Sequence, residues 1–274
     1  MQIAPDAQEG PRRIGFVEDH VAIIRDYLKT TVSECPDLEI VDGAETVTQL
    51  LEKTTDLDLV VLDLAHLPDK SKPADNVAAL RRAGIHNIIV LTVGDQRHLI
   101  QQAAKSGVLS IVRKKAAREL LIAALRSGAA GDPMPTIDWA ASIDHDPHAP
   151  EWDPRQGEII ELYATGLLGP DIAKLLGISM PELIHELKKI IEKYRLAPNK
   201  VPDLSPRELE VLRLYAYGDG AKEIAQILPI REHTVRTHIK NIKAKYERVG
   251  RPCNTKAEIR KNAIADGFIE GPRS

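Results

Sequence analysis

Five polar side chains in the first half of the chain directly follow or end short apolar runs. Glu18 and Asp19 come after IGFV, Asp63 follows LVVL, Thr92 ends NIIVLT, and Lys114 follows LSIVR. Carboxylates that lie close together repel one another, and the usual remedy is a hard cation such as Mg²⁺ held by oxygen ligands. A hydroxyl and an ammonium beside such a carboxylate can hold the oxygens of a phosphoryl group.

The runs that carry these residues are typical of strands in a parallel sheet. Short, β-branched runs alternate with amphipathic segments, which predicts a doubly wound α/β domain with five parallel strands. The carboxyl ends of such strands meet at one edge of the sheet, so we expect the five polar side chains to be neighbours. Strands are expected within 14–17, 57–64, 87–93 and 109–112, and helices within 21–32, 77–84, 99–107 and 117–128.

Residues 12–128 resemble the receiver domain of bacterial two-component response regulators. The motifs are IGFVEDH for the acidic pair, VVLDL for the phospho-acceptor, VLT for the switch hydroxyl and VRKK for the lysine. The resemblance implies that Asp63 accepts a phosphoryl group from a sensor histidine kinase. It also implies that Glu18, Asp19 and Asp63 hold Mg²⁺, that Thr92 is the switch residue and that Lys114 contacts the phosphate.

The segment after Asp63 departs from the receiver pattern. Pro68 stands one residue later than the family's spacing, the loop lacks the usual glycine, and Ile111 replaces a frequent aromatic residue. A degenerate receiver that senses a protein or a small ligand without phosphorylation therefore remains an alternative.

Residues 129–152 separate this domain from a helical C-terminal half. Positions 131–152 hold five acidic residues, four prolines and no basic residue, which predicts a linker. After it, 153–194 align without a gap on 205–246, and eleven or more positions are identical at this offset of 52. We therefore expect two copies of one helix-turn-helix fold, at 153–197 and within 203–270.

The second copy has the charge pattern of a DNA-reading helix. An apolar stripe at Val235, Ile239, Ile242 and Tyr246 packs inward, and seven basic residues against two acidic ones lie within 229–251. Such a helix fits the major groove, where Arg, Lys and Asn side chains can reach base edges.

This segment resembles the LuxR-type (NarL-like) DNA-binding domain of response regulators. The resemblance assigns base contacts to Arg236, Thr237 and Lys240, and phosphate contacts to Thr234 and Lys245; Asn241 lies on the same face and could pair with adenine. Residues 255–269 are similar to the terminal dimerisation helix of that family. Binding of double-stranded DNA as a homodimer is expected.

The first copy keeps the scaffold but not this polar face. The positions of Arg236 and Thr237 are taken by Ile184 and His185, and Ile191 and Met180 add apolar surface. We expect that this copy has lost base readout. Its apolar face either contacts another protein or packs under the linker or the receiver.

Composition excludes several other classes of protein. The two cysteines, Cys35 and Cys253, have no partner at metal-ligand spacing, and no stretch approaches the length of a membrane span. No enzyme motif is present, so we expect a cytoplasmic DNA-binding transcriptional regulator and not an enzyme. The rival is an RNA-polymerase-binding module like sigma-factor region 4, and a contact with RNA polymerase is possible in either case.

Overall fold

The computed structural model describes residues 10–65, 67–94 and 96–270. These residues divide into two compact units. The N-terminal unit holds residues up to 94, 99–144 and 151–195, and the C-terminal unit holds 96–98, 145–150 and 196–270.

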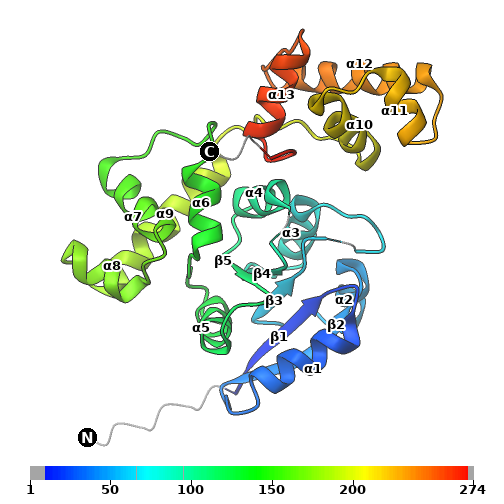
Figure 1. Ribbon diagram of the computed structural model, residues 1–274. Coiled ribbons are helices and arrows are strands. Elements are labelled where there is room, and N and C mark those ends of the chain that lie inside the picture. The colour runs from blue at the N-terminus through cyan, green and yellow to red at the C-terminus, as the bar shows by residue number, and fades with distance from the viewer. Residues whose placement is uncertain (1–9, 66, 95, 271–274) are drawn as a thin grey trace, which may run out of the picture. The chain divides into compact units, whose positions relative to one another are not determined.

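The N-terminal unit is built on a parallel five-stranded sheet, as predicted, and the structure gives its strand order as β2-β1-β3-β4-β5 (Figure 1). The central strands β3 and β4 are buried along their whole length, as is typical of a parallel sheet covered by helices on both faces. The strands are β1 (Arg12–Val17), β2 (Leu38–Ala44), β3 (Leu59–Leu62), β4 (Ile88–Thr92) and β5 (Ser110–Arg113).

Five helices connect and follow these strands: α1 (Val21–Thr31), α2 (Val47–Lys53), α3 (Pro73–Arg82), α4 (Arg97–Lys105) and α5 (Arg118–Ala129). The sequence runs predicted neither β2 nor α2. The strand β2, LEIVDGA, lies at the edge of the sheet and alternates apolar with acidic residues, so it lacks the continuous apolar run of a central strand. Phe16, Leu59 and Ile89 belong to the main core beneath the helices.

The prediction that 129–152 is only a linker is wrong in part, because residues Ile137–Asp144 form a helix, α6. Trp139 is fully buried, and Ala140 and Ile143 are buried beside it. The acidic residues and prolines of the segment predicted a linker, but Trp139, Ala140 and Ile143 lie on the buried side of a helix that packs against α7 (Pro154–Ala164).

The rest of the chain is helical, with two sets of three helices whose starts are offset by 52 residues. The first set is α7, α8 (Gly169–Leu176) and α9 (Met180–Leu196). The second is α10 (Pro206–Tyr217), α11 (Ala221–Ile227) and α12 (Glu232–Arg248), and α13 (Lys256–Ala265) follows. Among the residues that the structure covers, no helix has the length and apolar character needed to cross a membrane.

Equivalent hydrogen bonds hold both sets together. Arg155 Nη2 donates to the carbonyl oxygen of Leu176 at 3.0 Å, and Arg207 donates in the same way to Leu228. Each arginine thus ties the first helix of its set to the end of the second. The predicted stripe of α12 lies in the core of the C-terminal unit, with Val235, Ile242 and Tyr246 buried and Ile239 packed against them.

Candidate functional site

The carboxylates Glu18 and Asp63 lie at the carboxyl edge of the sheet, directly after the adjacent strands β1 and β3. The Glu18 amide donates to the Ala44 carbonyl at 3.0 Å, and the Asp63 amide donates to Val17 at 3.0 Å, so the strand pairing continues to both residues. At this edge the strand order changes direction between β1 and β3. Such switch points are where open α/β sheets bind ligands.

Lys114 joins the two carboxylates. Its Nζ donates to Glu18 Oε2 at 2.7 Å and lies 3.5 Å from Asp63 Oδ2. The Lys114 amide also donates to the Thr92 carbonyl at 2.7 Å, which fixes this lysine at the end of β5 beside β4. The sequence therefore predicted correctly that these residues of β1, β3 and β5 meet.

Burial opposes ionisation in this cluster. It raises the pKa of Glu18 to about 7, although the Lys114 ammonium acts in the opposite direction. Burial also raises the pKa of Asp63, again against the charge of Lys114. The pKa of Asp19 stays below its usual range, because hydrogen bonds from Glu18 and His20 outweigh the effect of burial.

The arrangement fits a divalent cation held by oxygen atoms. Glu18, Asp19 and His20 each offer one ligand atom, and these atoms lie within 4.8 Å of one another. The buried Asp63 Oδ1 has no hydrogen-bond partner within the described part of the chain, so this oxygen is available to a ligand. Oxygen donors of this kind suit Mg²⁺. The Mg²⁺ role of Asp63 stays a prediction, because Lys114 occupies the space beside its other oxygen.

His20 is the residue of this cluster that the sequence reasoning did not select. Its Nδ1 lies 2.8 Å from Asp19 Oδ1 and its ring is exposed. Its place directly after the acidic pair was the available signal. Thr92 is buried at the end of β4, and its hydroxyl accepts a hydrogen bond from the Gly94 amide at 3.2 Å. Its role as a switch residue stays a prediction.

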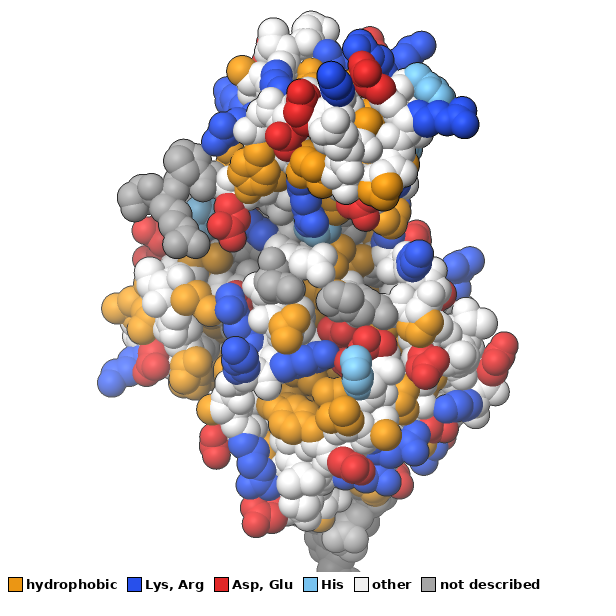
Figure 2. All heavy atoms as spheres, turned by 45° about the vertical axis from the view of Figure 1, so that its right-hand side comes forward, with side chains coloured by type: hydrophobic (Ala, Val, Ile, Leu, Met, Phe, Trp, Pro, Cys, Tyr) orange, Lys and Arg blue, Asp and Glu red, His pale blue; other side chains and the backbone are white. Residues whose placement is uncertain are grey.

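The second candidate site is the outer face of α12. Arg236, Thr237, Lys240 and Asn241 are exposed on it, and Thr234 is half-buried. Arg236 is held within the helix by Glu232, with 2.6 Å between Nη2 and Oε1, but its side chain is 71% exposed. An exposed pair of this kind costs little to break. Figure 2 shows Lys and Arg side chains interspersed with acidic ones on the visible surface.

Lys245 differs from these residues because it is already engaged. Its Nζ lies 2.5 Å from Oε2 of Glu208, a buried residue that also takes part in the capping box of α10 with Ser205. The pair links α12 to α10. In the first copy Lys193 donates to Gln156 at the equivalent positions, with a distance of 3.1 Å. For the predicted phosphate contact, the Lys245 ammonium would have to leave Glu208 or to bind Glu208 and a DNA phosphate at the same time.

The equivalent face of α9 in the first copy is covered only in part within its own unit, because His185 and Lys188 on it are exposed. Ile191 is buried and Ile184 is half-buried, while Met180 is 38% exposed. Lys188 Nζ donates to Asp132 Oδ1 at 2.8 Å. Of the two alternatives for this face, packing within the chain is the one that the structure supports.

The end of α9 is fixed to the receiver by further polar contacts. Lys105 Nζ of α4 donates to the Tyr194 carbonyl at 2.6 Å and lies 4.4 Å from the centre of the Tyr194 ring. The Arg195 side chain lies close to Gly107, where a Cβ would meet its Cδ at 3.0 Å. The first copy thus packs against the receiver through α9, the helix equivalent to α12.

Comparison with known proteins finds relatives of one kind. Residues 202–251 match the family model for bacterial regulatory proteins of the luxR family. The chain is 25% identical over 237 residues to the nitrate/nitrite response regulator protein NarP of Escherichia coli, covering 85% of this chain and 87% of that protein. It is 28% identical over 204 residues to the nitrate/nitrite response regulator protein NarL of the same organism, covering 69% of this chain and 92% of NarL. A solved structure of the response regulator RcsB of Salmonella typhimurium is 20% identical, with a TM-score of 0.45 over 68% of this chain and 93% of that one.

Proposed function

We propose that this chain, which resembles the NarL-type response regulators and whose residues 202–251 belong to the luxR family, regulates transcription by binding DNA under the control of Asp63 phosphorylation. The observation that carries the proposal is the arrangement of the acidic cluster. One buried oxygen of Asp63 is unpartnered within the described residues, and the other lies 3.5 Å from Lys114.

The phosphoryl transfer uses these two oxygens differently. The ionised Oδ1 attacks the phosphorus of a phosphohistidine on a sensor kinase, a P–O bond forms, and the P–N bond breaks with its electron pair returning to the imidazole. Lys114 stays beside Oδ2 and offsets the negative charge that the phosphoryl group brings. Glu18, Asp19 and Asp63 would hold Mg²⁺, which neutralises charge on the phosphoryl oxygens when it is bound.

The DNA contact is assigned to the exposed face of α12. Arg236 and Lys240 suit guanine edges, Asn241 suits adenine, and Thr237 can contact either base edges or the backbone. Thr234 and Lys245 are assigned to phosphates. Arg236 must exchange Glu232 for a base, which its exposure permits. Since helix-turn-helix proteins commonly bind paired half-sites, the active form is a homodimer.

The remaining partners follow from this assignment. A sensor histidine kinase supplies the phosphoryl group. Because the protein acts on DNA and on this kinase, we assign it to the cytoplasm. Contact with RNA polymerase is possible at the promoter. Apart from its own phosphorylation, the chain catalyses no reaction. The packing of α13 residues Ile259 and Ala263 with α10 and α12 in one core favours a LuxR-type domain over a sigma-like module.

Phosphorylation with acetyl phosphate and Mg²⁺, measured by intact mass, tests the proposal. We expect one phosphoryl group on the wild-type chain and none on Asp63→Asn. Asp26→Asn, which changes an exposed acid on α1, is the matched control and should still be labelled. Absence of labelling with every donor, or labelling that survives Asp63→Asn, would favour the degenerate receiver instead.

A further inference from the structure

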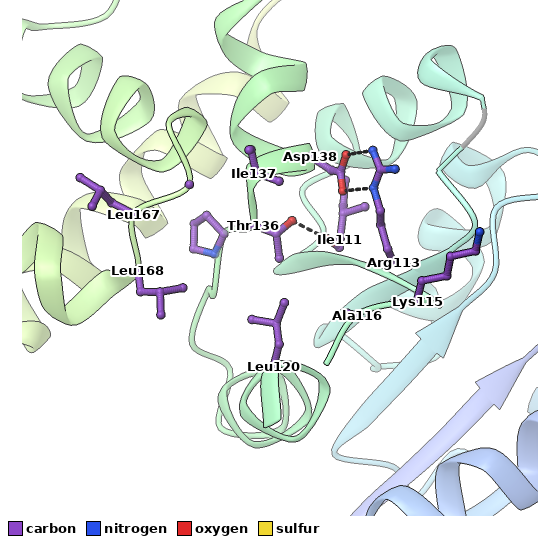
Figure 3. Close-up of a pocket in the computed structure, with 12 residues that line it drawn as sticks. Ile111, Arg113, Lys115, Ala116, Leu120, Thr136, Ile137, Asp138, Leu167 and Leu168 are labelled. Atoms are coloured by element: carbon purple, nitrogen blue, oxygen red, sulfur yellow. Dashed lines mark hydrogen bonds and ion pairs between the residues drawn. The ribbon is translucent and has the colours of Figure 1, made fainter. Parts of the chain in front are cut away.

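A pocket of about 420 Å³ opens where the end of β5 faces the loop between α7 and α8 (Figure 3). Its apolar lining includes Ile111, Leu120, Ile137, Leu167 and Leu168, which come from the receiver, α6 and the first helix-turn-helix copy. All of these residues belong to the N-terminal unit. The volume lies in the range of small-molecule sites, ~300–1,000 Å³.

Three apolar side chains that line the pocket are partly exposed to water. Leu168 is 56% exposed, Ile137 is 51% exposed and Leu167 is 37% exposed. Single exposed apolar residues are ordinary, but three around one hollow indicate a surface that is covered when a ligand binds.

The two helix-turn-helix copies show that the turn itself does not require these leucines. Leu167 and Leu168 correspond to Asp219 and Gly220 in the second copy. The Leu167 amide donates to Leu162 at 3.3 Å, and the Asp219 amide donates to the equivalent residue, Leu214, at 3.2 Å. Leu168 and Gly220 both cap the following helix in an extended conformation. The same turn thus forms with a polar and a small residue, so the leucines serve the pocket and not the turn.

Apart from Lys115, the polar side chains that line the pocket already have hydrogen-bond partners. Arg113 donates to both carboxylate oxygens of Asp138, at 2.6 and 2.7 Å, and the Thr136 hydroxyl donates to the Ile111 carbonyl. Lys115 is exposed, and in Figure 3 its side chain points away from the two leucines. A ligand in the pocket therefore meets apolar side chains and satisfied polar groups. A charged ligand would lose its hydration there without gaining a partner.

We propose that this pocket binds a small neutral molecule with an aromatic or branched hydrocarbon body. Its lining includes Arg113 and Lys115, the two neighbours of Lys114, so an occupant would touch the strand end that positions the phosphate partner. The same occupant would contact the turn of the first helix-turn-helix copy through Leu167 and Leu168. The site is independent of whether Asp63 is phosphorylated.

Titration of the full chain with N-phenyl-1-naphthylamine, a neutral dye that fluoresces in apolar surroundings, tests the proposal. We expect saturable binding to one site. The double variant Leu167→Asp and Leu168→Gly, which installs the sequence of the equivalent turn, should weaken binding by about tenfold or more because it removes two apolar walls. The matched control is Leu175→Gln, which alters a leucine that is 64% exposed on α8 outside the pocket and should leave binding unchanged.

A second titration uses 1-anilinonaphthalene-8-sulfonate, which adds a sulfonate to the same aromatic body. We expect it to bind more weakly than the neutral dye, and Lys115→Gln to affect neither. Tighter binding of the sulfonate that is lost in Lys115→Gln would replace the neutral ligand with an amphipathic anion and overturn the proposal. The proposal also fails if the wild-type chain shows no saturable binding, or if the double variant and Leu175→Gln bind the neutral dye alike.

Discussion

Lys188 and Lys240 occupy equivalent, exposed positions in the two helix-turn-helix copies, but the Lys188 ammonium is bound to Asp132 at 2.8 Å. The two copies share a scaffold, the same arginine-to-carbonyl bond and a buried tyrosine at the same place, Tyr194 and Tyr246. They differ in the side chains on the outer face of the third helix, where Ile184 and His185 stand in place of Arg236 and Thr237. The third helix of the first copy thus makes contacts within its own unit at positions where the proposed DNA contacts lie in the second copy.

This difference predicts a division of labour in DNA binding. Lys240→Ala should cost about 1–3 kcal/mol at a specific site and relax the base preference, because a contact with a base edge is lost. Lys188→Ala is the matched control and should leave DNA affinity nearly unchanged. Titrations of labelled DNA with each variant at several salt concentrations measure the two affinities. Equal losses in the two variants would show that the first copy is a second reading head.

The sequence predicted the sheet and the acidic cluster because both depend on local patterns. Continuous apolar runs such as LVVL are typical of buried parallel strands, and a residue that ends such a run, like Asp63, has its place at the carboxyl edge. The ammonium of Lys114 between Glu18 and Asp63 follows from the same rule. The sequence did not predict that His20 belongs to this cluster, because a histidine in a loop can serve many roles other than binding a ligand.

The sequence left two alternatives open for the apolar face of α9 and could not decide between them. The exposure of Ile191 depends on which surface lies opposite, and the contact with Asp132 joins residues 56 positions apart. The sequence did not predict the pairing of Lys245 with Glu208 either, because a lysine on a basic helix is usually solvated. Tertiary contacts between charged side chains leave no periodic signal in the sequence.

The pair of Lys245 and Glu208 should stabilise the C-terminal unit. Lys245→Ala would leave the buried carboxylate of Glu208 with the Ser205 amide but without its ammonium, and losing a hydrogen bond to a charged group costs roughly 1.5–3 kcal/mol. Adding Glu208→Gln should recover much of this loss, because an amide buries no charge and already occupies the equivalent position, Gln156, in the first copy. Hydrogen exchange of α12 peptides, read by mass spectrometry, reports the stability of this unit. Lys240→Ala is the control, and an equal effect of both lysine variants would contradict the structural role.

The stability of the same unit should fall as the pH rises from about 4 to about 6. Burial raises the pKa of Asp266 to about 6 even though Arg251 and Tyr246 both bind its carboxylate. The unfolded state has the ordinary pKa of about 3.9, so it releases this proton first as the pH rises, and unfolding becomes easier until the folded state is also ionised. A pKa difference of two units between the folded and unfolded states changes the free energy of unfolding by at most about 3 kcal/mol.

Asp266→Asn isolates this contribution from other groups that titrate nearby, among them His148, whose Nε2 lies 3.9 Å from Asp266 Oδ1. The variant should lose the fall in stability between pH 4 and 6 that we expect hydrogen exchange to show for the wild-type chain. Parallel pH curves for the two chains would mean that Asp266 keeps an ordinary pKa in the folded state.

The helix α6 should be essential to the stability of the N-terminal unit, because its residue Trp139 is fully buried. Trp139→Ala should cost about 3–5 kcal/mol, the usual price of removing a large aromatic side chain from a core. Trp139→Phe should cost much less than this. Its ring keeps part of the contact, and it removes an indole Nε1 that is buried and has no hydrogen-bond partner in the described residues, a burden of about 1–3 kcal/mol. Urea unfolding followed by far-UV circular dichroism ranks the variants. Little loss of stability in Trp139→Ala would show that residues 137–144 behave in solution as the simple linker that their acidic, proline-rich surroundings predicted.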